Sequence, residues 1–477
     1  MKTKAFGPLC CALLAAALIL VPAPREARAA GPASLFSDLP AIIDDAGIPG
    51  LSIGIVRGGI ITAGSFGVCE SGTDKAVTDT TAFEAASLTK PLFAYAALLL
   101  VDAGQLDLDR PLTTYIDFPD VENDERIHDV TARIVLSHTT GFPNWSRSDP
   151  LTIGPDPGST FGYSGEGFVF LQKAVERITG QTGEAFVTDA VLRPLGMTSS
   201  YLVWDDSLAS RTAVGHDFVG NVKDKWKPDA FNAASSLHTT ATDYARFLGE
   251  VMNPTLVSPA LVAEMLTPES DVTDGVFWGL GWGLEQSPPE AEVRFWHWGN
   301  NGYFKCFTLA SPDTDTGLIF FTNSENGLSI TNLVVDRVLG GTHPALDWKQ
   351  FTEFDSPAFT IEHALASAGL KDGADGVRAE HAQLLESYGP EDFEENMMNG
   401  LGYRLMGMEA LEAGVAVFRL NAGAYPDSWN VFDSLGEGLV QLGDTAAAIT
   451  SYEKSLDLNP ENTNGQSMLD ALQGHPR

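Results

Sequence analysis

Two groups of apolar segments, one near residues 51–63 and one near residues 293–322, predict the strands of one sheet. Residues 51–56 and 60–63 flank Gly58 and Gly59, and short apolar runs joined by two glycines are typical of a β-hairpin. Three later runs are separated by Asn, Gly, Pro and Asp residues, which favour turns: 293–297, 304–309 and 318–322. These segments predict an antiparallel sheet that the early hairpin joins.

Helical patterns occupy the chain between these strands. Residues 91–103 are apolar and good helix formers, with Pro91 in the first turn and Gly104 as the stop. Because this segment is apolar on every side, we expect a largely buried helix. Residues 168–171 predict a second buried helix, and the rest of 110–290 mixes short helical patterns with turns. The fold class is therefore α+β, with an antiparallel sheet flanked by helices.

A repeat of 34 residues occupies the end of the chain. Six residues of one unit return at that interval: Leu401, Gly402, Leu405, Gly414, Phe418 and Pro426 recur as Leu435, Gly436, Leu439, Ala448, Tyr452 and Pro460. Small residues where two helices cross, large ones between them and a closing proline are the tetratricopeptide pattern. We expect a small all-α repeat domain at 395–477, with units at 395–428 and 429–462 and a capping helix at 463–477. This domain is expected to bind a protein partner, and residues 346–394 are predicted to be a linker and helical segment.

The N-terminal residues predict export. Lys2 and Lys4 precede an apolar run at 9–21, and Ala27-Arg28-Ala29 supplies the small residues that a signal peptidase reads. We expect residues 1–29 to be a cleaved signal peptide and the protein to be periplasmic or secreted. No later apolar stretch has the length of a membrane span, so we expect no membrane insertion after cleavage.

The net charge limits which partners the protein can bind, and the cysteine content limits which disulfide bond it can form. The net charge of −34 repels nucleic acid and anionic lipid, so we exclude nucleic acid as a partner. Two of the four cysteines, Cys69 and Cys306, lie beyond the predicted signal peptide. An exported chain permits a disulfide between them, and whether they are bonded stays open.

Ser87 and Lys90 are the first candidates for chemistry. They lie three residues apart at the entry to the predicted helix 91–103, so both side chains share a face and the amine can reach the hydroxyl. A lysine acts as a base only when its amine is neutral, and burial lowers its pKa as that role requires. The same spacing recurs at Ser451 and Lys454, which we assign to the second helix of a repeat unit, without a catalytic role.

Tyr163 is a candidate to pass a proton between Ser87 and a leaving group. It precedes the predicted helix at 168–171, and a core tyrosine is the alternative interpretation. The segment Gly162-Tyr163-Ser164-Gly165-Glu166 also approaches the lipase nucleophile elbow Gly-x-Ser-x-Gly. It ends in Glu166, and no apolar strand leads into it, so we do not expect Ser164 to be a nucleophile.

His297 ends a predicted strand two residues before Gly299. The missing side chain of Gly299 lets a substrate lie against the strand edge. The backbone N–H of Asn300 is then a candidate oxyanion donor, together with that of Ser87. Three other histidines lack metal-ligand spacing and are assigned to turns or caps, so we expect no metal and no cofactor. These are His138, His216 and His238.

Residues 34–340 resemble the superfamily of serine β-lactamases and penicillin-binding proteins, in the branch of class C β-lactamases, D-alanyl-D-alanine carboxypeptidases, D-aminopeptidases and related esterases. Six segments carry the resemblance: Ser87-Leu-Thr-Lys90, Tyr163-Ser-Gly165, His297-Trp-Gly299, Leu136-Ser-His-Thr-Thr-Gly141, Pro194-Leu-Gly-Met197 and Ser236-Leu-His-Thr-Thr-Ala241. The resemblance implies Ser87 as nucleophile, Lys90 and Tyr163 as the base system, and His297 in place of the lysine of the Lys-Thr-Gly motif. It also implies a β-lactamase-like hydrolase domain at 30–345, with an all-helical lobe beside the sheet.

Two positions depart from the pattern of the penicillin-binding members. Gly165 stands where they usually carry Asn, which removes an amide contact to the acylamino group of the substrate. His297 replaces the usual lysine, and a histidine is only partly cationic near neutral pH. Both changes weaken recognition of a β-lactam. We therefore expect a serine hydrolase that forms an acyl-enzyme with an ester or amide, on a small-molecule or peptide-like substrate.

Two alternatives stay open. Some D-Ala peptidases also carry His at the position of His297, so a D-alanyl-D-alanine carboxypeptidase or weak β-lactamase is the second enzyme hypothesis. A degenerate hydrolase scaffold that binds partners through its repeats is the hypothesis from another class. The intact Ser87, Lys90 and Tyr163 argue against it, because a scaffold has no reason to keep all three.

Overall fold

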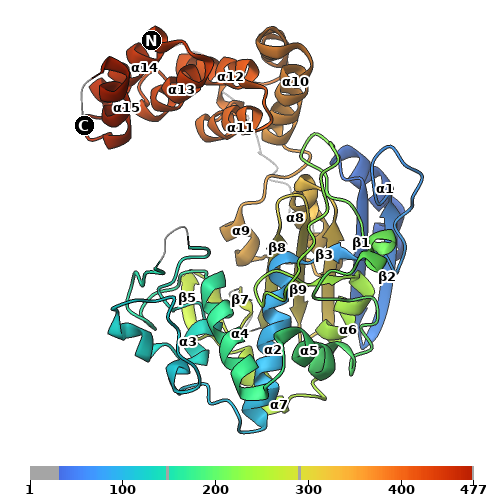
Figure 1. Ribbon diagram of the computed structural model, residues 1–477. Helices are drawn as coiled ribbons and strands as arrows, with labels where there is room; N and C mark the ends of the chain where they lie inside the picture. Colours follow the sequence, from blue (N-terminus) through green and yellow to red (C-terminus); the bar gives the residue numbers. More distant parts are fainter. Residues whose placement is uncertain (1–31, 147–149, 288–291, 475–477) are drawn as a thin grey trace, which may run out of the picture.

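The computed structural model describes residues 32–146, 150–287 and 292–474. The predicted signal peptide at 1–29 lies outside these residues. An eight-stranded antiparallel sheet runs in the order β2-β1-β10-β9-β8-β7-β6-β5 (Figure 1). Its strands are β1 (Gly50–Arg57), β2 (Ile60–Gly67), β5 (Ser270–Thr273), β6 (Val276–Trp278), β7 (Gly283–Gln286), β8 (Val293–Asn300), β9 (Lys305–Ser311) and β10 (Thr316–Thr322).

The sequence prediction of the sheet is confirmed. Gly58 and Gly59 take φ values of 56° and 72°, the left-handed conformation that a tight two-residue hairpin requires. The hairpin joins the later strands through β1, where Ile53 pairs with Phe320 of β10. The early and late parts of the chain therefore form one sheet.

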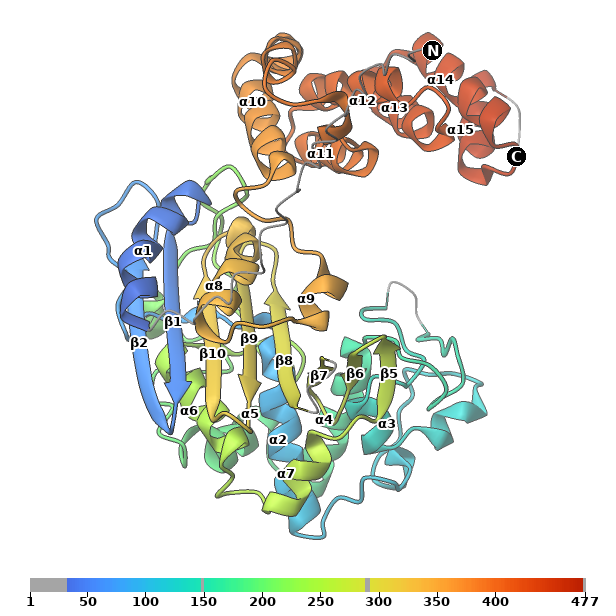
Figure 2. The ribbon, with the colours of Figure 1, turned by 180° about the vertical axis from the view of Figure 1, so that it is seen from behind.

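Helices cover both faces of this sheet (Figures 1 and 2). On one face α1 (Pro32–Asp45) and α8 (Thr331–Val338) pack around Phe320, and on the other α6 (Ala241–Met252) packs near Ile319 and Phe321. Neighbouring residues of a strand point to opposite faces. Because both faces are buried, these strands are apolar at successive positions rather than at every second one.

A mostly helical lobe lies beside the sheet. Its most completely buried helix, α2, runs Thr89–Asp102 and so begins two residues earlier than predicted. Gly104, just beyond its end, has φ 67°. The remaining helices on this side are α3 (Ala132–Leu136), α4 (Gly165–Thr179), α5 (Gly183–Val187) and α7 (Pro259–Met265). Strands β3 (Phe83–Glu84) and β4 (His238–Thr239) form a separate two-stranded sheet, and β3 comes shortly before α2 in the chain.

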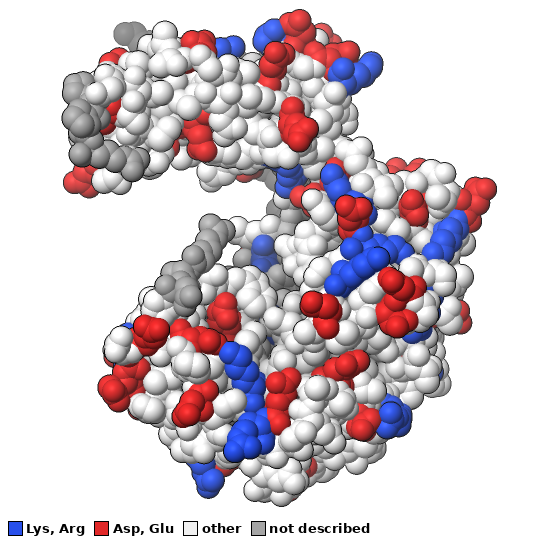
Figure 3. Space-filling model, in the orientation of Figure 1, with Lys and Arg blue, Asp and Glu red and all other residues white. Residues whose placement is uncertain are grey.

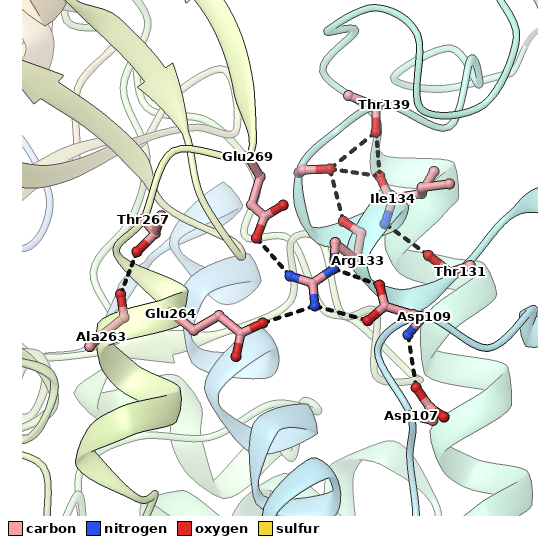
Figure 4. A network of polar contacts seen from close by, with 11 residues as sticks. Asp107, Asp109, Thr131, Arg133, Ile134, Thr139, Ala263, Glu264, Thr267 and Glu269 are labelled. Carbon is pink, nitrogen blue, oxygen red and sulfur yellow. Dashed lines mark hydrogen bonds and ion pairs between the residues drawn. The ribbon is translucent and has the colours of Figure 1, made fainter.

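An ion-pair network around Arg133 ties the helical lobe to the end of the sheet (Figure 4). Its guanidinium donates to Asp109 at 2.6 Å, to Glu264 at 2.8 Å and to Glu269 at 2.6 Å. Glu264 lies in α7 and Glu269 directly precedes β5. The network therefore fixes α3, whose next loop carries His138.

The C-terminal region is helical. Helix α9 (Pro344–Lys349) packs on β6 and β7, so the predicted boundary after residue 345 falls inside it. Helix α10 (Pro357–Leu384) follows, with a break at Gly373, and then five helices: α11 (Glu395–Gly407), α12 (Leu411–Ala424), α13 (Trp429–Leu442), α14 (Thr445–Leu458) and α15 (Thr463–Gln473). Arg404 of α11 lies 4.4 Å from the ring of Phe218, which precedes α6 in the part of the chain that contains the sheet.

Acidic side chains are spread over both parts of the face drawn in Figure 3, and a hollow separates the helical C-terminal region from the lobe below it. Within the described residues, no helix has the length and apolar character needed to cross a membrane.

Candidate active site

Ser87 lies in a tight turn that brings its hydroxyl to the end of a buried helix. The turn, η1 (Ala86–Leu88), leads directly into α2, and Ala86 has φ 48°, an uncommon conformation for a residue with a side chain. Thr89 holds it, since its hydroxyl donates to the Ala86 carbonyl at 2.6 Å and accepts from the Leu237 N–H at 3.0 Å. Ala86 and Leu88 are buried while Ser87 is partly exposed, which leaves Ser87 accessible to a substrate.

Lys90 is fully buried behind Ser87. Its Nζ lies 3.1 Å from Ser87 Oγ and donates to the carbonyl oxygen of Ala234 at 3.0 Å. No carboxylate among the described residues forms an ion pair with it, and burial lowers the pKa of Lys90 to about 7. A neutral amine with one N–H on Ala234 can direct its lone pair at the Ser87 hydroxyl. The structure therefore places a suitable base at the predicted nucleophile.

Tyr163 and His297 form the opposite side of the site. Tyr163 Oη lies 3.5 Å from His297 Nε2, and His297 Nδ1 lies 2.8 Å from the Trp298 carbonyl oxygen. A carbonyl only accepts, so Nδ1 carries the proton and Nε2 accepts from the phenol. Burial and then the charge of Lys90 lower the pKa of His297 to about 3. His297 is therefore neutral at physiological pH.

Burial raises the pKa of Tyr163 well above its usual range, and a hydrogen bond with the Ser87 side chain acts in the opposite direction. The Lys90 Nζ also lies 4.8 Å from the centre of the Tyr163 ring. Tyr163 is thus a neutral phenol, and its ring lies beside the buried Lys90 amine.

His138 holds Tyr163 in place, a role that the sequence did not reveal. As expected it lies in a turn, with φ 56°, and its carbonyl accepts from the Gly162 N–H at 2.7 Å. Its Nδ1 accepts from the Ser164 N–H at 3.0 Å, and its ring lies 4.3 Å from the Tyr163 ring. His138 therefore fixes the segment on both sides of Tyr163.

Gly299 lets β8 approach the Ser87 turn closely. A Cβ on Gly299 would lie 2.5 Å from the Ala85 carbonyl oxygen and 2.3 Å from Cys306 Sγ, which is shorter than any contact a side chain tolerates. The next residue, Asn300, is held by its side-chain oxygen, which accepts from Lys305 Nζ at 2.7 Å. The strand edge and the nucleophile turn therefore face each other.

Cys306 and Cys69 are both buried free thiols.

The space beside the Cα of Gly165 is occupied by a neighbouring side chain that the sequence did not indicate. A Cβ on Gly165 would lie 2.7 Å from Cη2 of Trp145, and the Gly165 N–H donates to the Asn144 side chain at 3.0 Å. Trp145 is 45% exposed, and its ring centre lies 5.9 Å from Lys90 Nζ. An indole ring therefore lines the site next to the position at which the penicillin-binding pattern has an asparagine.

The two competing serines have structural roles. Ser164 is buried and caps α4: its hydroxyl donates to the Pro143 carbonyl at 2.9 Å and accepts from the Gly167 N–H at 3.0 Å. This is incompatible with a nucleophile elbow. Ser451 lies in α14 and donates to the Ala447 carbonyl at 3.0 Å.

Comparison with protein families identifies the class. The model of the Beta-lactamase family matches residues 33–334, more than half of the chain, so the chain belongs to this family. Penicillin-binding protein 4 of Amycolatopsis lactamdurans is 29% identical over 185 residues, which cover 35% of this chain and 49% of that protein. Protein flp of Staphylococcus aureus strain MRSA252 is 23% identical over 303 residues, 58% and 60% of the two chains. The chain spans about half to three fifths of the length of these relatives.

Solved structures share the fold. The octameric penicillin-binding protein homologue from Pyrococcus abyssi aligns with a TM-score of 0.57 at 22% identity, over 70% of this chain and 81% of that chain. The D-alanine carboxypeptidase AmpC from Burkholderia cenocepacia aligns with a TM-score of 0.56 at 20% identity, over 64% and 98%. These likenesses establish the β-lactamase-like α+β fold.

Proposed function

We propose that this protein is an exported serine hydrolase that forms an acyl-enzyme at Ser87 with an ester or amide substrate. The observation that carries the proposal is the buried Lys90 amine, 3.1 Å from the Ser87 hydroxyl and without an acidic partner among the described residues. The family match agrees with this class of chemistry. Export rests on the N-terminal pattern at residues 1–29.

The proposed reaction assigns one role to each of these residues. Ser87 Oγ attacks the substrate carbonyl carbon while its proton passes to the Lys90 nitrogen lone pair, and the carbonyl π electrons move onto oxygen. The backbone N–H groups of Ser87 and Asn300 stabilise this oxyanion. When the oxyanion collapses, the bond to the leaving group breaks and the leaving atom takes a proton from Tyr163, which Lys90 replaces. Water then attacks the acyl-enzyme carbonyl carbon and gives a proton to the same base system. When the second oxyanion collapses, the bond to Ser87 Oγ breaks, Oγ takes that proton back, and the acid leaves.

An ester or peptide-like substrate fits the site better than a β-lactam. Gly165 has no side-chain amide with which to bind an acylamino group, and the Trp145 ring lies against it. The nearby Asn144 side-chain oxygen accepts from the Gly165 N–H. His297 is neutral and supplies no charge for a carboxylate. A D-alanyl-D-alanine carboxypeptidase or weak β-lactamase is the second candidate, because the Burkholderia protein with the same fold is a D-alanine carboxypeptidase.

We also assign residues 395–462 to two tetratricopeptide repeats that bind a protein partner. Gly402 lies against the Phe418 ring and Gly436, 34 positions later, lies against the Tyr452 ring. Tyr403 donates to Glu437, again 34 positions later, at 2.9 Å. Equivalent contacts at a fixed interval support a stacked repeat.

A fluorophosphonate probe tests the enzyme proposal directly. It should label the wild-type protein at Ser87, as read by mass spectrometry, and Ser87→Ala should abolish both labelling and ester hydrolysis. Loss of a nucleophile from a coupled catalytic set costs on the order of 10⁶ in kcat. Ser451→Ala is the matched control and should keep full activity. Ser87→Ala activity within about tenfold of wild type would rule out Ser87 as the nucleophile. A wild type that is neither labelled nor active on esters would favour the scaffold hypothesis.

A further inference from the structure

A short finger from the part of the chain that contains the sheet reaches into the core of the helical C-terminal region. Residues 215–223 form this finger, and at its base the Lys223 N–H donates to the Gly215 carbonyl at 2.9 Å. Phe218 lies at the tip and is 2% exposed. It belongs to one apolar cluster with residues of α10, α11 and α12. The finger therefore ties the two parts of the chain together.

The tip of the finger is held by its ring and by its backbone. The Arg404 guanidinium of α11 lies 4.4 Å from the centre of the Phe218 ring. The Phe218 N–H donates to the Glu325 carboxylate at 3.2 Å, and the Phe218 carbonyl accepts from the Asn326 side chain at 2.9 Å. Both acceptor and donor belong to a short helical turn, η6 (Glu325–Ile330). Phe218 is thus fixed between α11 and η6.

The base of the finger packs on the turn between β8 and β9. A Cβ on Gly215 would lie 2.7 Å from Tyr303 Cβ and 3.0 Å from a carbon of the Phe304 ring, so the two backbones are in close contact. The Lys223 Nζ lies 5.5 Å from the centre of the Tyr303 ring. This turn begins at Asn300, whose N–H is the candidate oxyanion donor. A shift of the finger would therefore move the turn that carries this donor.

A second connection runs from η6 to Asn300 through a buried lysine. A Cβ on Gly327 would lie 2.8 Å from Lys305 Cβ, so η6 packs directly on the first residue of β9. The Lys305 Nζ donates to the Asn300 side chain at 2.7 Å. Burial lowers the pKa of Lys305 to about 8, and the charges of Glu325 and Arg404 act on it in opposite directions. The lysine that holds Asn300 is therefore sensitive to the contact between η6 and α11.

We propose that the helical C-terminal region belongs to the catalytic unit, and that Phe218 and Arg404 are positioning residues for the oxyanion donor Asn300. This inference rests on the proposed function, in which the Asn300 N–H stabilises the oxyanion. A donor stabilises that charge only at hydrogen-bond distance from the oxygen, so a small displacement of the turn slows acylation. The helices are then required for full turnover, apart from any partner that they bind.

The test compares two substrates that differ in one atom, 4-nitrophenyl butanoate and its thionoester, which has C=S in place of C=O. Sulfur is a weak hydrogen-bond acceptor, so a thionoester gains little from oxyanion donors. Arg404→Met removes the charge beside Phe218 and keeps an apolar stem. In single-turnover kinetics its acylation rate at saturating ester should fall about tenfold, with half-saturation unchanged. The rate with the thionoester should hardly change, so the ratio of the two rates falls about tenfold.

Matched controls separate positioning from a general loss of stability. Arg419→Met removes an exposed arginine of α12, and Phe393→Ala removes a ring of the same apolar cluster that packs on His381 of α10. Phe218→Ala should lower the ratio as Arg404→Met does, and both controls should leave it unchanged. If Phe218→Ala does not fold, as judged by circular dichroism, Arg404→Met and Arg419→Met decide the test. An unchanged ratio in Arg404→Met, or an equal fall in Phe393→Ala, would overturn the inference.

Hydrogen exchange separates failure of this inference from failure of the proposed function, because it requires no turnover. A peptide that spans residues 298–306, measured by mass spectrometry, should exchange faster in Arg404→Met than in wild type or in Arg419→Met. If wild type cleaves neither substrate, the proposed function fails, while this peptide still decides whether the helical region holds the turn. Equal exchange in the three proteins would contradict a positioning role of Arg404.

Discussion

Tyr163 Oη lies 3.5 Å from His297 Nε2, although the two residues are 134 positions apart in the chain. Because His297 Nδ1 faces the Trp298 carbonyl, the free nitrogen accepts from the phenol and keeps Tyr163 directed into the site. In the proposed proton relay His297 is a neutral hydrogen-bond acceptor. This differs from the charge-based role that a lysine would have at the same place.

Lys90 and Tyr163 are predicted to act on the same proton. Lys90→Met and Tyr163→Phe should each slow acylation by about 10² to 10⁴, as is typical of general-base groups. The double variant should lose far less than the product of the two single losses, because the second substitution removes a relay that is already broken.

Single-turnover kinetics with a nitrophenyl ester measures these acylation rates. Losses that multiply in the double variant would show that Tyr163 and Lys90 act independently. In that case Tyr163 would be a packing residue between Trp298 and His138.

The pH dependence of acylation should follow Lys90. Its pKa is lowered to about 7, and only the neutral amine can accept the Ser87 proton. For a neutral ester, kcat/KM should therefore rise with pH up to about 7 and level off above it. Burial lowers the pKa of His138 and of His297, the two histidines whose charges interact with Lys90. Neither histidine should therefore add a second pH-dependent change in kcat/KM near neutrality.

The check is a profile between about pH 5.5 and pH 8.5, corrected for spontaneous hydrolysis and repeated with His297→Gln. The rise in kcat/KM should have its midpoint near pH 7 in both proteins. A flat profile, or a limb that disappears in the His297 variant, would assign the titration to another group.

Gly299→Ala should inactivate the enzyme without unfolding it. The added methyl group would meet the Ala85 carbonyl oxygen and Cys306 Sγ, so β8 must move away from the Ser87 turn. Displacing one oxyanion donor costs about 10² to 10³ in kcat. Gly249→Ala in α6 is the control, because nothing lies within 4 Å of its Cβ and alanine favours a helix. Circular dichroism and kcat for a small ester distinguish the two variants; equal kcat values would remove Asn300 from the oxyanion site.

Part of the fold and of the candidate site could be predicted from the sequence, because those features depend on residues close together in the chain. Ser87 and Lys90 share a helical turn, and the contact between them depends on helix geometry alone. Gly58 and Gly59 likewise specify the hairpin, because few other residues adopt positive φ twice in succession. The 34-residue interval was also visible, since each pair of helices repeats the same spacing of small and large residues.

The rest of the site was decided by packing between distant segments. Nothing near Gly165 in the sequence indicates that Trp145 fills its space, and nothing near His297 indicates that Lys349 reaches the Trp298 ring. The sequence also left the charge of His297 open, because a histidine pKa depends on burial and on Lys90, which lies more than two hundred positions earlier. Periodicity and spacing determine contacts within one element, whereas electrostatics and shape in the site depend on which elements the tertiary fold places together.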